Sequence, residues 1–114
     1  MSIQLNKNPS WQVFKLADLT EKVKGDEAKF LEFLNVSSMS CAVYHLPKGC
    51  NDMQSPHAED EVYVVLSGKG SLKVDDQHHD IEPGTVLFVR ANTIHSFFDI
   101  EEDLTVMAMF GAQH

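Results

Sequence analysis

The chain has 114 residues, enough for one domain with a single hydrophobic core and too few for two. Its apolar fraction of 43% is typical of a globular protein and excludes extensive disorder. Acidic residues outnumber basic residues by 17 to 9, and the resulting net charge of −8 disfavours binding to nucleic acid, whose phosphates attract clustered Lys and Arg.

We expect neither a secretory signal nor a membrane span in this sequence. Residues 1–10 are polar and lack the apolar stretch of a secretory signal, and no apolar run approaches the roughly 18–20 residues that span a membrane. The two cysteines, Cys41 and Cys50, are therefore expected to be reduced thiols rather than a disulfide. We expect a cytoplasmic protein with no membrane partner.

The N-terminal third is expected to cover the rest of the domain. Residues 16–24 form a short helical pattern that Gly25 would end. Residues 30–36 combine aromatic and branched side chains that fit a helix or a strand equally well, and periodicity does not decide over so short a run. We interpret residues 1–36 as an arm and covering segment of the same domain as residues 37–114.

The remainder of the chain alternates between short apolar segments and turn residues, a pattern typical of an all-β sandwich or barrel. The expected strands are residues 40–46, 62–66, 70–75, 78–81, 85–89, 94–99 and 104–110. Turns are expected at residues 67–68, 75–77, 82–84 and the acidic stretch 101–103.

Two of these strands, residues 62–66 and 85–89, are apolar on both faces. One face would fill a barrel, and the other needs to be covered by the N-terminal segment or by a second subunit. The pattern therefore predicts a homodimer.

Candidate metal ligands concentrate in two stretches. The first, residues 49–68, carries His57, Glu59 and Glu61, and the second, residues 84–99, carries His95. Imidazole and carboxylate groups directed at one point are typical of a transition-metal site.

The two stretches resemble the motifs of the cupin family. In the first, Glu61 follows His57, and Gly68 comes after six further residues; Ser55 occupies the usual position of a first histidine. In the second, Gly84 and His95 have the family spacing. Arg90, Asn92 and Asp99 replace the usual Pro, Gly and Asn, and Asn92 is a residue that tolerates the positive φ of the replaced glycine. The resemblance implies a double-stranded β-helix, or jelly-roll, barrel.

The resemblance also implies a site. His57, Glu61 and His95 take three metal-ligand positions, a set of two imidazoles and one carboxylate that suits Fe, Zn, Mn or Ni. Gln54 is the candidate for the fourth ligand in place of Ser55, ahead of Glu59. Glu59 and Tyr63 are the candidate catalytic acid or base groups.

Two functions remain open from the sequence. One is an enzyme of dioxygenase, isomerase or lyase type that acts on a small organic molecule at the metal. The other is a non-catalytic module that binds a small ligand or a metal. The fold hosts both kinds of protein, so it does not decide between them.

Overall fold

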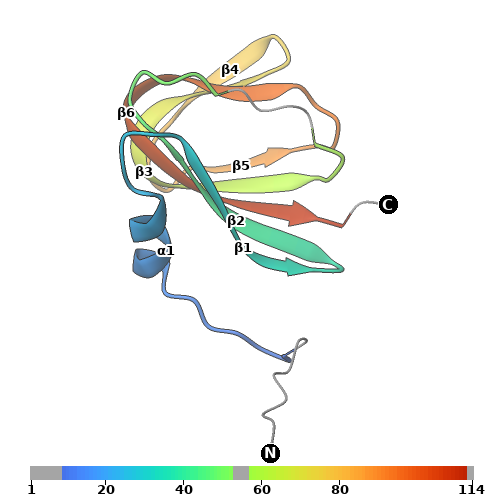
Figure 1. Ribbon diagram of the computed structural model, residues 1–114. Helices are drawn as coiled ribbons and strands as arrows, with labels where there is room; N and C mark the ends of the chain where they lie inside the picture. Colours follow the sequence, from blue (N-terminus) through green and yellow to red (C-terminus); the bar gives the residue numbers. More distant parts are fainter. Residues whose placement is uncertain (1–8, 53–56, 113–114) are drawn as a thin grey trace, which may run out of the picture.

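The computed structural model describes residues 9–52 and 57–112, and within these ranges one helix precedes six strands (Figure 1). The elements are α1 (Leu16–Val23), β1 (Lys29–Val36), β2 (Met39–Leu46), β3 (Glu61–Val74), β4 (Gln77–Ile81), β5 (Val86–Val89) and β6 (His95–Gly111). The prediction of an all-β fold with a short N-terminal helix is confirmed. The helix is far too short to cross a membrane, and no other helix is found among the described residues.

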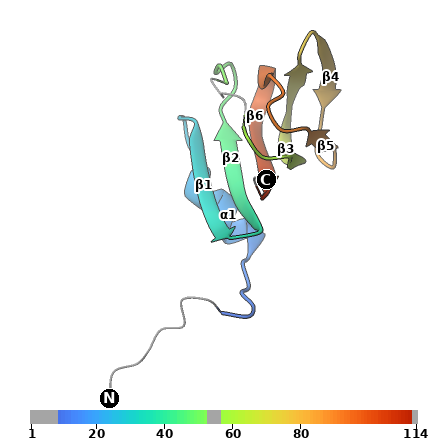
Figure 2. The ribbon, with the colours of Figure 1, turned by 90° about the vertical axis from the view of Figure 1, so that its right-hand side faces the viewer.

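All six strands belong to one antiparallel sheet with the order β1-β2-β6-β3-β4, and β5 pairs with β3 (Figure 2). The long strands β3 and β6 pair along both of their halves. In the first half of β3 the other neighbour is β5, whereas in the second half it is β4. The sheet thereby curls around one interior.

The bend in the long pair lies where the sequence predicted turns. The register between β3 and β6 shifts three times between Val65 and Ser71, and Gly68 has a φ of 93°. The turn expected at residues 67–68 is wrong because these residues are bulges within one continuous strand, which bend a sheet without ending it. The acidic residues 101–103 likewise do not separate two strands, because β6 continues through them with their side chains exposed.

The structure resolves one ambiguity in the sequence and confirms two expected turn positions. The ambiguous residues 30–36 belong to a strand, β1, which pairs with β2 along its length. Asn92 has a φ of 61°, as its position in place of glycine indicated. Gly84 has a φ of 90° in the turn between β4 and β5. The boundary proposed between residues 36 and 37 falls inside the β1–β2 hairpin.

The sheet has apolar side chains on both faces. The inner face is filled by a cluster that includes Tyr63, Val65, Phe97, Val106 and Ala108, all nearly fully buried. A second, smaller cluster lies on the outer face, where Leu19 and Val23 of α1 pack against Val43 of β2. The helix thus covers one part of the outer face.

We predict that Gly68→Ala destabilises the fold more than Gly84→Ala. Both positions have positive φ, and an alanine there costs about 1–2 kcal/mol of backbone strain. A Cβ at Gly68 would also overlap the backbone carbonyl of Asp103, whereas a Cβ at Gly84 meets no atom within 4 Å. Urea denaturation of the two variants measures the difference, and equal losses of unfolding free energy would show that the close approach of β3 to β6 is unimportant.

Candidate metal centre

Glu61 is the first residue of β3 and points into the sheet interior. Its side chain is 2% exposed, and Tyr63 and Val65, which share its face of the strand, are also buried. Pairing with β5, where Glu61 lies opposite Val89, fixes the position of the strand start. The carboxylate is therefore held at the inner end of the strand.

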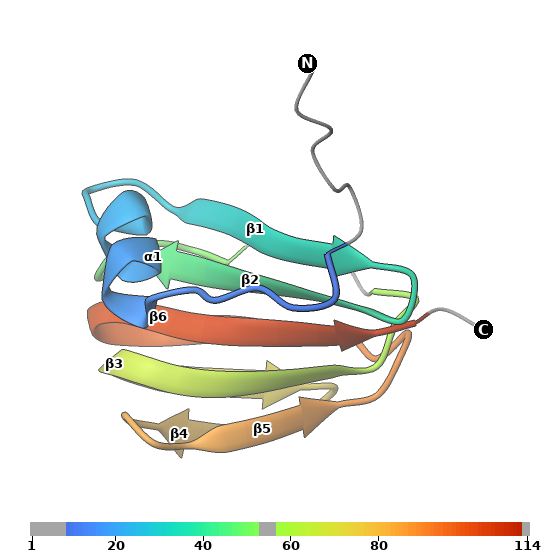
Figure 3. The same ribbon diagram turned by 90° about the horizontal axis from the view of Figure 1, so that it is seen from below.

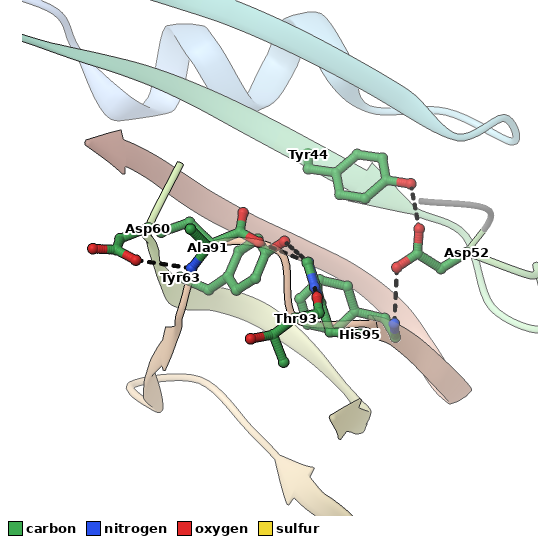
Figure 4. A network of polar contacts seen from close by, with 9 residues as sticks. Tyr44, Asp52, Asp60, Tyr63, Ala91, Thr93 and His95 are labelled. Carbon is green, nitrogen blue, oxygen red and sulfur yellow. Dashed lines mark hydrogen bonds and ion pairs between the residues drawn. The ribbon is translucent and has the colours of Figure 1, made fainter. Parts of the chain in front are cut away.

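His95 is the first residue of β6 and is oriented through both ring nitrogens. Its Nδ1 donates to the backbone carbonyl of Thr93 at 2.8 Å, which leaves Nε2 to face the interior. There Nε2 lies 3.1 Å from the hydroxyl of Tyr63 (Figure 4). It also lies 2.7 Å from Oε1 of Glu61. Histidine ligands of metals are usually oriented in this way, by a hydrogen bond from the ring nitrogen that does not bind the metal to a backbone carbonyl.

His57 lies in the loop before β3 and is half-buried. Its ring centroid is 5.7 Å from that of His95 and 5.3 Å from that of Phe110. The backbone carbonyl of His57 accepts a hydrogen bond of 2.6 Å from the amide of Asn92. The loop that carries the first candidate ligand is thus tied to the turn that precedes the third.

The ligand atoms of His57, Glu61 and His95 all lie within 4.8 Å of one another. Within the ranges that the structure describes, Oε2 of Glu61 is buried and has no hydrogen-bond partner. Buried carboxylate oxygens normally have a partner, so this oxygen requires one. Two imidazoles and a carboxylate with a vacant acceptor fit a divalent transition metal.

Burial alone would lower the pKa of His95, but hydrogen bonds to Glu61 and to the Thr93 carbonyl, with the nearby charges of Glu61 and Asp52, together raise the pKa. The short contact between Nε2 and Oε1 explains this direction. Two acceptor lone pairs repel each other at 2.7 Å unless a cation lies between them. In the metal-free protein a proton takes this place at pH values below the raised pKa of His95.

Asp52 is a site residue that the sequence did not reveal. Its carboxylate accepts from the Tyr44 hydroxyl at 2.9 Å and from the backbone amide of Phe97 at 2.8 Å (Figure 4). Burial and the Asp52 charge raise the pKa of Tyr44 far above its ordinary value, so Tyr44 remains a donor. Asp52 thereby ties the loop after β2 to two strands of the sheet.

Of the remaining predicted site residues, one contacts the cluster, one lies outside it, and two are not among the described residues. Gln54, the expected fourth ligand, and Ser55 lie outside the described residues. Glu59 is half-buried in the bend before β3 and is not part of the His57–Glu61–His95 cluster. Tyr63 is 1% exposed and contacts His95.

The other histidine and cysteine side chains have structural surroundings. His45 is buried and bonds to the Thr105 hydroxyl and the Gly25 carbonyl. Cys41 and Cys50 are free thiols, as expected, and burial raises the pKa of each. A raised pKa lowers the thiolate fraction and with it the reactivity of both thiols.

The ionisable groups around the cluster include carboxylates but no lysine or arginine side chain of the described residues. Every Lys and Arg that the structure describes is exposed, so these residues place no cationic side chain in the interior beside Glu61 and Asp52. The positive charge that balances the carboxylates must then come from a histidine proton or from a bound cation, and this leaves the site open to a metal.

Comparison with known proteins agrees with this geometry. Residues 42–110 match the family model described as a cupin domain. An uncharacterised protein of Streptomyces coelicolor is 36% identical over 99 residues, which are 87% of this chain and 94% of that protein.

Solved structures share the fold at low sequence identity. An RmlC-like cupin family protein with a double-stranded β-helix fold, from Methanocaldococcus jannaschii, matches with a TM-score of 0.74 and 15% identity over 93% of this chain and 94% of its own. The DMSP lyase DddQ of Ruegeria pomeroyi matches with a TM-score of 0.71 and 15% identity over 76% of this chain. This chain covers 48% of that lyase, about half its length.

We predict that the Glu61–His95 pair stabilises the metal-free fold in a pH-dependent way. Because the folded-state pKa of His95 is raised, the contribution is present below the ordinary value of 6.5 and is lost as the pH rises through the folded-state pKa. The measurement is the unfolding free energy of wild type and Glu61→Gln, both treated with chelator, between about pH 5 and about pH 9. The advantage of wild type should shrink with rising pH; a constant difference would contradict the pairing.

Proposed function

This chain belongs to the cupin family, and from that premise we propose that it is a metal-dependent enzyme acting on a small organic molecule. His57, Glu61 and His95 would hold one divalent transition metal, such as Fe, Zn, Mn or Ni. The observation that carries the proposal is the buried Oε2 of Glu61, which has no partner among the described residues although it lies beside two imidazoles.

The reaction type that the site supports best is a dioxygenase, isomerase or lyase reaction. A metal in this site supplies Lewis acidity and, if it is iron, a centre for oxygen chemistry. The protein's own contribution is a set of positioned donors and acceptors in a water-poor interior. The lyase among the structural neighbours agrees with this class of reaction without identifying a substrate.

Tyr63 is the side chain best placed to move a proton. Its hydroxyl is buried and lies 3.1 Å from Nε2 of His95, the nitrogen that faces Glu61. A substrate held beside the cluster would meet this hydroxyl, which can donate a proton or accept one after deprotonation. Glu59, in the half-buried bend before β3, is the second candidate for this role.

The surroundings of the cluster also bear on the substrate. No Lys or Arg of the described chain reaches the interior, so a strongly anionic group would have to rely on the metal for its charge partner. Aromatic rings and hydroxyls, such as those of Tyr44, Tyr63 and Phe97, would surround the remainder of the molecule. These groups support a small substrate that is neutral or carries a single acidic group.

The metal site is tested by elemental analysis of untagged protein. Wild type should carry about one equivalent of metal per chain, and Glu61→Gln should bind it at least 100-fold more weakly, since even outer partners of ligands typically contribute about 10–100-fold. Glu59→Gln is the matched control, because it makes the same chemical change two residues away and should keep the metal. Equal metal content in wild type and Glu61→Gln would refute the site.

Tyr63→Phe separates catalysis from metal binding. The variant should keep its metal and lose about 10²–10⁴-fold in kcat, the usual contribution of a general acid or base. NMR of metal-loaded protein with a panel of small hydroxy and keto compounds would detect turnover that a chelator abolishes. If compounds bind tightly and none is converted, the protein is the non-catalytic binding module instead.

A further inference from the structure

A series of aromatic rings leads away from the metal cluster. The centroid of the His57 ring lies 5.3 Å from that of Phe110. The ring of Phe30 lies 6.3 Å from that of Phe110 and 5.7 Å from that of Tyr44. Interacting rings usually have centroids about 4.5–7 Å apart, so each ring contacts the next. We call Phe30, Tyr44 and Phe110 the aromatic wall; it begins beside a candidate metal ligand and its residues come from β1, β2 and β6.

The strand register places the aromatic wall on the same face as the cluster. Phe30 lies opposite Tyr44 in the β1–β2 pair, and Phe110 lies opposite Glu61 in the β3–β6 pair. Residues opposite each other on neighbouring strands point to the same face, and Glu61 points inward. Tyr44 likewise packs against the buried apolar side chains of the inner face. Figure 3 shows β1, β2, β6 and β3 side by side in this order, so the wall extends from the cluster to the edge strand β1.

Exposure to solvent falls along the wall toward the metal ligands. Phe30 is 52% exposed, Tyr44 is half-buried, and Phe110 is 8% exposed. Glu61 and His95, at the inner end, are almost fully buried. The wall therefore leads from solvent to the cluster. Binding sites for small molecules combine apolar and aromatic walls with a few polar groups, and here the two lie side by side.

The rings of the wall are held in place without a ligand. The hydroxyl of Tyr44 donates to Asp52, so Tyr44 offers a ligand mainly its ring (Figure 4). The plane of the Phe30 ring is inclined by 69° to that of Tyr44 and by 56° to that of Phe110. Such tilted and edge-to-face contacts are the favoured geometries between rings. A further ring can therefore be added on the exposed side of Phe30 without disrupting these contacts.

The charges near the wall select the polar part of a ligand. The described lysine and arginine side chains are all exposed, so the carboxylate of a ligand would find its cation at the metal. At the outer end, the exposed Glu32 follows Phe30 by two residues and therefore lies on the same face of β1. A carboxylate there repels a second anionic group. The combination favours a ligand with one carboxylate at the metal and an uncharged ring along the wall.

We infer that the aromatic wall is the specificity-determining subsite of the metal centre and that it binds the ring of a small aryl carboxylic acid. The carboxylate of this acid would bind the metal, and its ring would pack against the wall, with Phe30 on the solvent side. The inference rests on the proposed function, because the metal is the charge partner of the carboxylate. It adds the class of substrate and identifies Phe30 as the residue that sets the preference for a ring.

Benzoate and acetate are the probes, because they carry the same carboxylate and differ in the ring. The full chain loaded with zinc should bind benzoate at least 10-fold more tightly than acetate, since the ring is removed from water. Phe30→Ala should weaken benzoate binding by about 3–10-fold, the usual contribution of one aromatic pair, and leave acetate binding unchanged. NMR titration of the zinc-loaded proteins measures these affinities, and elemental analysis should show equal zinc in both.

Phe88→Ala is the matched control. Phe88 is 57% exposed, close to the value for Phe30, but it lies opposite Val62 on the outer face of the sheet. This variant removes the same kind of ring and should bind benzoate as wild type does. If circular dichroism shows that Phe30→Ala fails to fold, Phe30→Leu replaces it. Leucine keeps the apolar bulk and loses the ring, so benzoate binding should again weaken while acetate binding does not.

Failure of the inference and failure of the proposed function give different results. Zinc-loaded wild type and Phe30→Ala with equal affinities for benzoate would overturn the aromatic subsite and leave the metal site in place. A zinc-loaded chain that prefers acetate, or that binds neither acid, would overturn it as well. A wild-type chain that takes up no zinc or other divalent metal would refute the proposed function, and the inference would fall with it.

Discussion

The contact between Nε2 of His95 and Oε1 of Glu61, at 2.7 Å in a buried setting, is the constraint on which the site depends. It is stable only with a cation between the two atoms, either a shared proton or a metal. Both residues begin long strands, β3 and β6, that pair with each other along most of their length. The curl of the sheet places the starts of its two longest strands together, so the fold itself sets the distance between the two candidate ligands.

The turn between β5 and β6 adds the third ligand to this pair. Asn92, at a φ of 61°, donates its amide to the His57 carbonyl, and the neighbouring Ala91 amide donates to the Asp60 side chain. The carbonyl of Thr93 in the same turn orients the ring of His95. One short segment therefore holds both the loop of the first motif and the histidine of the second.

The sequence was sufficient for the fold class and for the cluster, because alternation and motif spacing are local properties of the chain. His57, Glu61 and His95 were predicted from the resemblance of their stretches to the cupin motifs, and the structure brings them together. The role of Thr93 leaves no sequence signal, since any residue supplies a backbone carbonyl. Gly68 was misread as a turn because the glycine signals a positive φ, while its pairing partner lies more than thirty residues away in β6. The pairing of β3 with β6, which lies far along the chain, makes residues 67–68 a bulge rather than a turn.

The alternation of β3 separates the side chains of the cluster from those of the outer face. Glu61, Tyr63 and Val65 face inward to the cluster, and Val62 and Val64, between them, face outward. Successive side chains of a strand point to opposite faces, so a one-residue slip of β3 would exchange the two sets. A carboxylate would then enter the apolar outer face, and valine would replace a candidate metal ligand.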